Sequence, residues 1–542
     1  MPINCNPLVA IVLMAALSGN SPAGTPRGAE APPADVAASF AASEFATSGA
    51  VVPVRLSVAN TSADTMSELR IGTNQLFTYR LDVAVPPGQV RAVAFAPWYF
   101  DGSLSLGGVA DPLSPRPLPA DTALLLFDPA DVHPERLTDH LMRWSLRYFP
   151  PVPGSEPMGL ARPEPVGLEG LTAPALKNSV AAAVVVSAER ADLATFRRLA
   201  ADAGKDLWTI DAAGVLGLLE PVPPALRQMA GRIHLRDDLL DLSPGGEPLY
   251  IPAKLFRIRS GDWPAGQRLK FMIPALVVVA LLVCLAMLGW SLPIALKVMA
   301  ALVILGAGVV WTLLAVGGSE FTFVDAVTVT TCDSPSGRAL SEHLVSVSGL
   351  RRESVSLGFR AAHLGPPRPL MAADVDRTVY DGLVLHRDLE GRWSIEDLDV
   401  RPGLLLAFGA TQWEPKAFPA GDVTLGMQSG RREVRLKRWR PLEDAYLYVG
   451  NRAYPMAGVR EEQAYRACDV ASSIDGAAYS GSAPAEPFRR RAMRWVARHV
   501  ARQGTTVFFG WQAVPAIVQA DRTGVAYHGR LVIWLVPEAG AL

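Results

Sequence analysis

The sequence predicts a multidomain membrane protein with an N-terminal β-sandwich, a small three-layer α/β domain, a two-helix transmembrane hairpin and a C-terminal β-rich domain. Its 542 residues exceed the roughly 100–200 residues of one domain. Hydrophobic residues make up 50% of the chain and charged residues only 19%, a balance typical of proteins with membrane-embedded segments. The hydrophobic pattern also changes along the chain from alternating to continuous and back, which indicates domains of different architecture.

Residues 1–23 are predicted to be a signal peptide. The apolar stretch at residues 8–17 is too short for the roughly 20 residues that span a bilayer, and small residues follow it. We expect cleavage after Ala23. Residues 24–45 are rich in alanine, proline and glycine and are expected to form a flexible lead-in. The signal segment predicts that the rest of the chain is exported.

Residues 46–118 are predicted to form the β-sandwich. Apolar side chains alternate with polar ones around Val54 and again at residues 79–85, as in half-buried strands. The segment Pro86-Pro87-Gly88-Gln89 has proline and glycine at the positions that a type II turn requires, so we expect a hairpin between residues 79–85 and 90–96.

Residues 119–250 are predicted to form the α/β domain. The continuous apolar run at residues 123–127 resembles a strand covered on both faces, and Pro134 begins an amphipathic helix. A second strand at residues 180–187 is followed by another helix and a third strand at residues 207–210. This order predicts a βαβ unit with a parallel sheet.

Residues 271–316 are predicted to form the transmembrane hairpin, with spans at 271–290 and 293–316. The first span contains no charged residue, and the second contains only Lys297. The short connection places the flanking domains on the same side of the membrane. Combined with the signal peptide, this predicts a protein of the bacterial inner membrane whose large domains face the periplasm, with the lipid bilayer as a partner.

Residues 318–542 are predicted to form the β-rich domain, with one clear helix at residues 486–503. An apolar stripe on this helix either packs into the domain or lies on an anionic membrane surface. The membrane-surface candidates are Arg489, Arg490, Arg491, Arg494, Trp495 and Arg498.

Two cysteines of the C-terminal domain, Cys332 and Cys468, are candidates for a disulfide, because exported proteins form such bonds. The alternative is a pair of unbonded, buried thiols, since a separation of more than a hundred residues gives no local indication of geometry.

The chemistry that the sequence predicts is limited to the carboxyl ends of the α/β strands, where ligands bind in such folds. These ends carry Asp128, Ser187 and Asp211. The three side chains could serve as acid, base or metal ligand. The alternative, which is the commoner role of Asp and Ser at such positions, is that they cap turns and helices. No phosphate loop, nucleophile elbow or zinc spacing is present, so we expect no cofactor and no metal. The net charge of -1 gives no basic field for nucleic acid.

Residues 442–450 (LEDAYLYVG) with Gly458, and the later Phe509-Gly510-Trp511-Gln512, resemble segments of uncharacterised bacterial inner-membrane proteins in which exported β and α/β modules flank a transmembrane hairpin. The resemblance covers mainly the last third of the chain and brings no catalytic residues with it. The sequence therefore favours a membrane-anchored scaffold or binding module of the cell envelope, which binds other envelope proteins. The alternative is an exported hydrolase or transferase that uses the α/β crevice.

Overall fold

The computed structural model describes two long parts of the chain. These are residues 34–222, with gaps at 48–49, 74–76, 100–101, 108, 110–111, 120 and 150–158, and residues 322–536, with gaps at 334–337, 350–351, 362–363, 370–379, 381, 402–403, 415–422, 437–440, 450–451, 460–463, 468–471, 474–488, 490–495 and 497–505. Residues 226, 278, 298–304 and 306 are also described.

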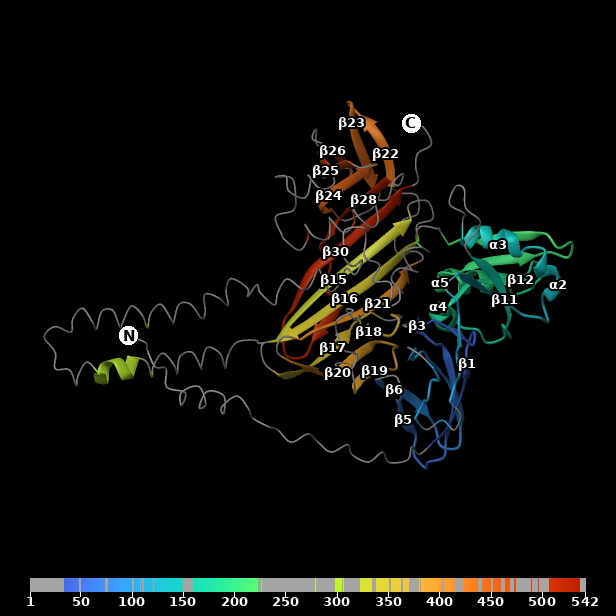
Figure 1. Cartoon of the computed structure of the whole chain (residues 1–542), viewed down its shortest axis with the longest axis horizontal. Coiled ribbons are helices and arrows are strands. Elements are labelled where there is room, and N and C mark those ends of the chain that lie inside the picture. The colour runs from blue at the N-terminus through green and yellow to red at the C-terminus, as the bar shows by residue number, and fades with distance from the viewer. Residues whose placement is uncertain are drawn as a thin grey trace, which may run out of the picture.

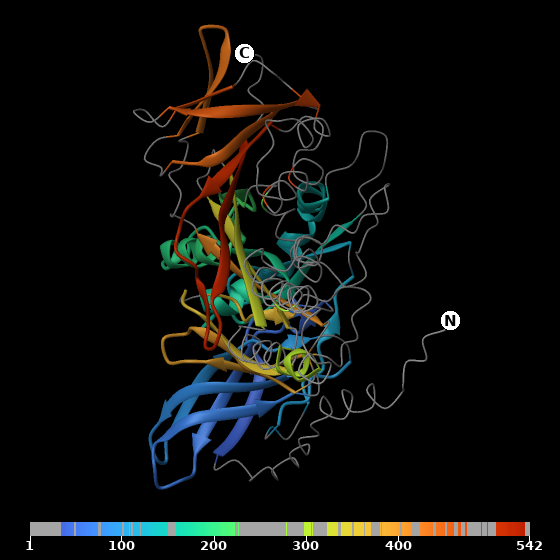
Figure 2. The ribbon, with the colours of Figure 1, turned by 90° about the vertical axis from the view of Figure 1, so that its left-hand side faces the viewer.

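The largest sheet is built from the C-terminal part of the chain. Its central strand β15 (Thr322–Asp333) pairs antiparallel with β16 (Ala339–Gly349) and parallel with β30 (Val525–Val536), so the first and last strands of this part lie side by side. Figures 1 and 2 show these long strands running through the middle of the molecule. The order across the sheet is β18 (Arg368–Pro369), β21 (Leu405–Glu414), β16, β15, β30, β28 (Thr506–Gln512), β24 (Glu443–Val449), β25 (Arg452–Val459), β26 (Ala464–Ala467), β23 (Arg431–Leu436) and β22 (Val423–Gln428), with β27 (Ser472–Ser473) on β25.

A second sheet joins the two ends of the chain. Strand β6 (Phe77–Val85) of the N-terminal part pairs parallel with β19 (Leu383–Arg387), which lies about 300 residues later in the sequence. The order in this six-stranded sheet is β29 (Val518–Ala520), β17 (Glu353–Phe359), β20 (Trp393–Val400), β19, β6 and β5 (Met66–Gly72). The N-terminal and C-terminal β regions therefore share one sheet instead of forming a sandwich and a separate β domain.

The remaining N-terminal strands form a three-stranded sheet in the order β1 (Ala34–Phe40), β4 (Val54–Asn60) and β7 (Val90–Phe95). The expected hairpin between β6 and β7 is wrong, because these strands belong to different sheets. The turn itself forms, with Gln89 N–H donating to Pro86 O (3.2 Å) and Gly88 at a φ of +68°. Hydrogen bonds between this turn and Asn60 hold it at the end of β4, so the turn carries the chain from one sheet to the other.

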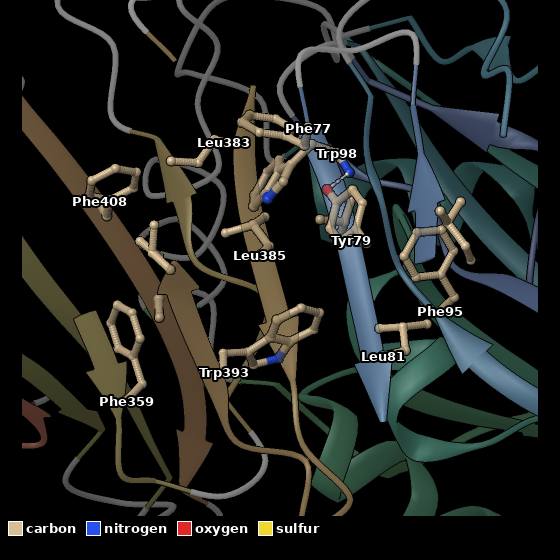
Figure 3. Packing of buried hydrophobic residues seen from close by; sticks show 14 of the residues in the cluster. Phe77, Tyr79, Leu81, Phe95, Trp98, Phe359, Leu383, Leu385, Trp393 and Phe408 are labelled. Atoms are coloured by element: carbon tan, nitrogen blue, oxygen red, sulfur yellow. Dashed lines mark hydrogen bonds between the residues drawn. The ribbon is translucent and has the colours of Figure 1, made fainter. Parts of the chain in front are cut away.

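One hydrophobic core lies between these sheets and contains residues from both parts of the chain. Tyr79 of β6 is fully buried, and its ring contacts Phe95 edge-on (4.9 Å between centroids) and Trp393 of β20 (6.5 Å). Its hydroxyl oxygen accepts a hydrogen bond from the backbone N–H of Trp98 (2.9 Å), as Figure 3 shows. Because a buried N–H without a partner is costly, this bond fixes the depth at which Tyr79 lies.

A cluster of polar side chains lies on the outer face of the same sheet, where strands of the N-terminal and C-terminal parts pair. The imidazole of His386, on β19, lies between two carboxylates, with Nε2 3.0 Å from Asp82 of β6 and Nδ1 3.0 Å from Glu396 of β20. Arg80 of β6 reaches Glu396 as well (3.2 Å). Side chains from three neighbouring strands thus hold each other across the N-terminal to C-terminal boundary.

Residues 122–220 form a five-stranded sheet with helices on both faces. Its order is β11 (Leu160–Pro165), β10 (Thr122–Phe127), β12 (Ala181–Ser187), β13 (Asp206–Ile210) and β14 (Leu216–Glu220). The first four strands in this order are parallel, and β14 pairs antiparallel with β13. The short helices α2 (Pro134–Thr138) and α3 (Leu141–Tyr148) pack on one face, and α4 (Ala173–Asn178) and α5 (Leu193–Ala203) pack on the other.

The α/β unit is docked against strand β21 of the large sheet. Gly204, which ends α5 with a φ of +66°, lies so close to the indole of Trp413 that a Cβ atom would come within 2.2 Å of Trp413 Cε2. Lys177 Nζ donates to the carbonyl of Thr411 (3.4 Å). An ion pair between Arg338 and Glu220 adds a third contact. Figure 1 shows this unit beside the long strands.

The predicted fold class has to be corrected at the transmembrane hairpin. Within the part of the chain that the structure describes, no helix combines the length and apolar character that a membrane span requires. Of the segments 271–290 and 293–316, only residues 278, 298–304 and 306 are described. The predicted signal peptide lies outside the described residues.

We predict that Gly204→Ala loosens the docking of the α/β unit. The new methyl group meets both a left-handed backbone and the Trp413 ring, so we expect a loss of about 2–4 kcal/mol in the free energy of unfolding. Denaturant unfolding measures it. Gly214→Ala is the matched control, because Gly214 has a φ of +79° but no atom within 4 Å of the added Cβ, so only the backbone cost of about 1 kcal/mol remains. Equal losses in the two variants would contradict the role of Trp413.

Candidate functional site

The structure brings the three predicted strand-end residues to one edge of the α/β sheet. Asp128 follows β10, Ser187 ends β12 and Asp211 follows β13, and these strands are neighbours. The chain order reverses between β10 and β12, because β11 lies on one side of β10 and β12 on the other. Ligands of such folds bind at this switch point, so Asp128 and Ser187 are at the place where chemistry is expected.

Each of the three side chains accepts a hydrogen bond from a nearby backbone N–H group. Asp128 Oδ1 accepts from Ala130 (3.0 Å), and Asp211 Oδ1 accepts from Val215 (2.7 Å). Ser187 Oγ accepts from Glu189 (3.3 Å). These bonds stabilise the turns that follow the strands, which is the common role of Asp and Ser at such positions.

Asp131 bridges the switch point. Its Oδ2 accepts from the backbone N–H of Ser187 (2.9 Å) and pairs with Arg190 Nη1 (3.3 Å), so a side chain of the β10 loop is bound to the end of β12. Arg190 also pairs with Asp192 (2.6 Å). Asp131 and Arg190 are not recognisable as a pair in the sequence, because they follow different strands and only the parallel pairing brings them together.

The opposite edge of the sheet holds a second buried network. Asp206, at the start of β13, is fully buried and accepts from Arg147 Nε (2.9 Å) and the Tyr148 hydroxyl (2.9 Å), both on α3. Trp208 Nε1 donates to the same hydroxyl oxygen (3.0 Å). A buried carboxylate requires a compensating charge, which Arg147 provides for Asp206. The same network binds α3 to β13.

Arg489 is the one predicted membrane-surface residue that the structure describes. Its Nη1 pairs with Glu443 (2.9 Å) and Asp444 (2.8 Å), and its guanidinium lies over the ring of Trp511 (5.3 Å). Arg490, Arg491, Arg494, Trp495 and Arg498 lie outside the described residues. Arg489 is therefore bound to its own domain, and the bilayer contact of this helix stays a prediction.

Of the two candidate disulfide cysteines, only Cys332 is described. It is 1% exposed and lies in the core under β23, β25 and β26, which also contains Ala467. Cys468 is outside the described residues, so the disulfide stays a prediction.

A row of polar residues that no local sequence pattern indicates crosses one face of the large sheet. The register aligns Gln512 of β28, Arg530 of β30, Thr328 of β15 and His343 of β16. Their apolar neighbours on that face belong to two different cores, because Ala326 and Val345 lie in the core shared with the N-terminal part and Cys332 lies in the other. We call these four residues the polar row.

A chain of hydrogen bonds joins Tyr527 to the polar row. The Tyr527 hydroxyl donates to Thr328 Oγ1 (3.0 Å), and Thr328 Oγ1 is hydrogen-bonded to His343 Nδ1 (3.0 Å). Burial, together with the charges of Arg530 and Lys177, lowers the pKa of His343 to about 3. The imidazole is therefore neutral at ordinary pH.

Glu342 points to the opposite face of β16. It is 6% exposed, and its Oε1 is 3.6 Å from Arg368 Nη2. Burial raises the pKa of Glu342 to about 7, although the charge of Arg368 opposes this rise. Among the described residues, no group of three His, Cys, Asp or Glu side chains could hold a metal ion.

Comparison with known proteins does not assign the chain to a family. No protein-family model and no curated protein matches the chain. Among solved structures, an M1 zinc metallopeptidase from Deinococcus radiodurans aligns with a TM-score of 0.14 and 9% identity over 29% of this chain. A two-domain M1 zinc metallopeptidase variant bound to L-tryptophan gives the same values. The match spans 41% of either solved chain, and a similarity this low carries no argument about fold or activity.

We predict that Glu342 makes the stability of the protein fall between about pH 4.5 and pH 7. Because its folded pKa is raised, the folded state holds more protons than the unfolded state in this window, and stability decreases as the pH rises through it. In Glu342→Gln this part of the slope disappears, a difference on the order of 2–3 kcal/mol between the two pH limits. Chemical unfolding from pH 4 to 8 measures it, and Glu390→Gln, at an exposed side chain, is the control. Identical slopes in wild type and Glu342→Gln would contradict this prediction.

Proposed function

We propose that the protein is an exported binding or scaffold protein of the bacterial cell envelope and not an enzyme of the α/β crevice. The observation that carries this proposal is the bridge made by Asp131 to Ser187 at the switch point. A catalytic carboxylate there needs to reach a substrate, whereas the carboxylates of Asp128, Asp131 and Asp211 each accept hydrogen bonds from the backbone beside them.

The arrangement of the sheets supports the same proposal. A scaffold needs a rigid frame, and here β6 and β19 join the two ends of the described chain into one sheet and one core. The α/β unit is fixed to this frame at Trp413 and Thr411. Its position beside the long strands suits a protein that presents surfaces to other envelope proteins.

We predict that Asp128→Asn and Asp211→Asn keep the cellular function. The amide oxygen of asparagine still accepts the backbone hydrogen bond, so the turns remain, while the charge that acid–base or metal chemistry needs is lost. Complementation of a deletion strain at matched protein abundance measures it. Loss of function in a variant that accumulates normally would contradict the proposal and favour an exported hydrolase or transferase.

Export is inferred from the sequence of residues 8–17. We predict that the mature protein isolated from its own host begins at Gly24 and lies outside the cytoplasm. Mass spectrometry of the N-terminus after cell fractionation measures this. Leu13→Arg places a charge in the apolar segment and should block processing, whereas Asn6→Ser, before the segment, should not. An uncleaved cytoplasmic protein would contradict the inference.

A further inference from the structure

Strand β22 lies at one end of the large sheet and has a free edge. It pairs with β23 on one side, and within the described part of the chain no strand pairs with its other side. Figure 1 shows β22 and β23 at the end of the molecule that is farthest from the N-terminal strands. A free edge presents unpaired N–H and C=O groups, so it is a place where another strand can bind.

The turn between β22 and β23 indicates which groups face the free edge. Ser429 and Gly430 have φ values of +52° and +77°, as in a two-residue turn of type I′. A hydrogen bond between the residues on either side closes such a turn, and those residues are paired in the register. Because bonded and non-bonded pairs alternate along an antiparallel ladder, Met427 and Leu425 turn their backbone N–H and C=O groups away from β23.

The free edge of β22 lacks the features by which proteins discourage the pairing of exposed strands. Its sequence, VTLGMQ, contains no charged residue and no proline, and its pairing with β23 contains no bulge. Strands β18 and β29 also end sheets, but they have only two and three residues. The other strands that end described sheets of three or more strands each carry a charge, at Asp35, Glu68, Arg91, Arg162 or Glu220.

A positive charge lies beside this edge. Arg466 of β26 reaches across β23, and its Nη2 donates to Gln428 Oε1 of β22 (2.7 Å). The register aligns Arg466 with Glu433 and Gly426, and the space above Gly426 is open. Glu433 pairs with Arg435 (3.2 Å), whereas the partner of Arg466 on β22 is a neutral amide. Strands β22, β23 and β26 together carry four arginines and one glutamate, so the field at this edge is positive.

The opposite face of β22 is apolar. Leu425 packs against the core that contains Val434 and Tyr465. Met427, two residues further on, is 67% exposed. Because successive side chains of a strand alternate between its faces, Leu425 and Met427 share one face and Gln428 lies on the other. A strand added at this edge can extend the core with apolar side chains of its own.

We propose that the free edge of β22 binds an extended peptide segment of a partner protein in which acidic side chains alternate with apolar ones. The peptide adds a strand through backbone hydrogen bonds to Leu425 and Met427. Its acidic side chains lie toward Arg466, and its apolar side chains lie beside Met427. A second copy of this chain fits less well, because pairing β22 with itself brings two sets of arginines together. The inference rests on the proposed binding function and specifies the chemistry of a partner.

The experiment titrates the full-length protein with a labelled decapeptide in which valine alternates with glutamate. We expect a saturable rise in fluorescence anisotropy that weakens as salt is added, and slower hydrogen exchange at Leu425 and Met427. The same peptide with lysine in place of glutamate should bind about tenfold more weakly or worse. Arg466→Gln should weaken binding of the glutamate peptide about fivefold. Arg352→Gln is the control and should not weaken it, because that exposed arginine pairs with Asp399 away from β22.

A second variant tests the backbone hydrogen bonds. Met427→Pro removes an N–H group of the free edge and should weaken binding about tenfold or more, whereas Met427→Ala keeps this N–H and should weaken it less. If Met427→Pro fails to fold, Arg466→Gln and the exchange measurement on the wild type still decide the question.

Four results would overturn the proposal. These are a glutamate peptide that does not saturate, a lysine peptide that binds equally well, amides of Leu425 and Met427 that are already protected in the free protein, and a dimer that Met427→Pro dissociates, which assigns the edge to a second copy. If the peptide fails while Asp128→Asn still complements the deletion strain, this inference alone is wrong and the proposed function stands.

Discussion

The parallel pairing of β6 with β19 is the constraint on which the rest of this structure depends. A parallel pair needs a crossover connection, and here that connection contains the whole α/β unit and the first strands of the large sheet. Once the pair forms, Tyr79 meets Trp393, and His386 comes between Asp82 and Glu396. Segments that would otherwise be separate domains are thereby joined into one frame.

This frame also determines where the α/β unit lies. Its last helix ends at Gly204, where the absence of a side chain allows the indole of Trp413 to approach the backbone. A similar dependence holds for the polar row, which exists only because β15 has β16 on one side and β30 on the other. The same face of the sheet thus passes from one apolar core through a polar band to a second apolar core.

The two candidate regions differ in how their polar groups are satisfied. At the carboxyl edge of the α/β sheet, the carboxylates of Asp128, Asp131 and Asp211 accept hydrogen bonds from nearby N–H groups, so their lone pairs stabilise loops. In the polar row, Thr328 is hydrogen-bonded to His343, and the buried Nε of Arg530 has no hydrogen-bond partner among the described residues.

The sequence by itself determined the local elements. Alternation around Val54 and at residues 79–85 located strands β4 and β6, and the continuous run at residues 123–127 located β10, because side-chain periodicity depends only on neighbouring residues. The apolar runs predicted two membrane helices, whereas the described residues contain no helix long and apolar enough to span a membrane. A turn motif led to the wrong expectation of a hairpin between β6 and β7, because a turn does not specify the partner of a strand. Only the tertiary structure decided that β6 pairs with β19 and that Arg530, Thr328 and His343 share a row. Strand register arises from contacts between residues hundreds of positions apart, and no local pattern contains it.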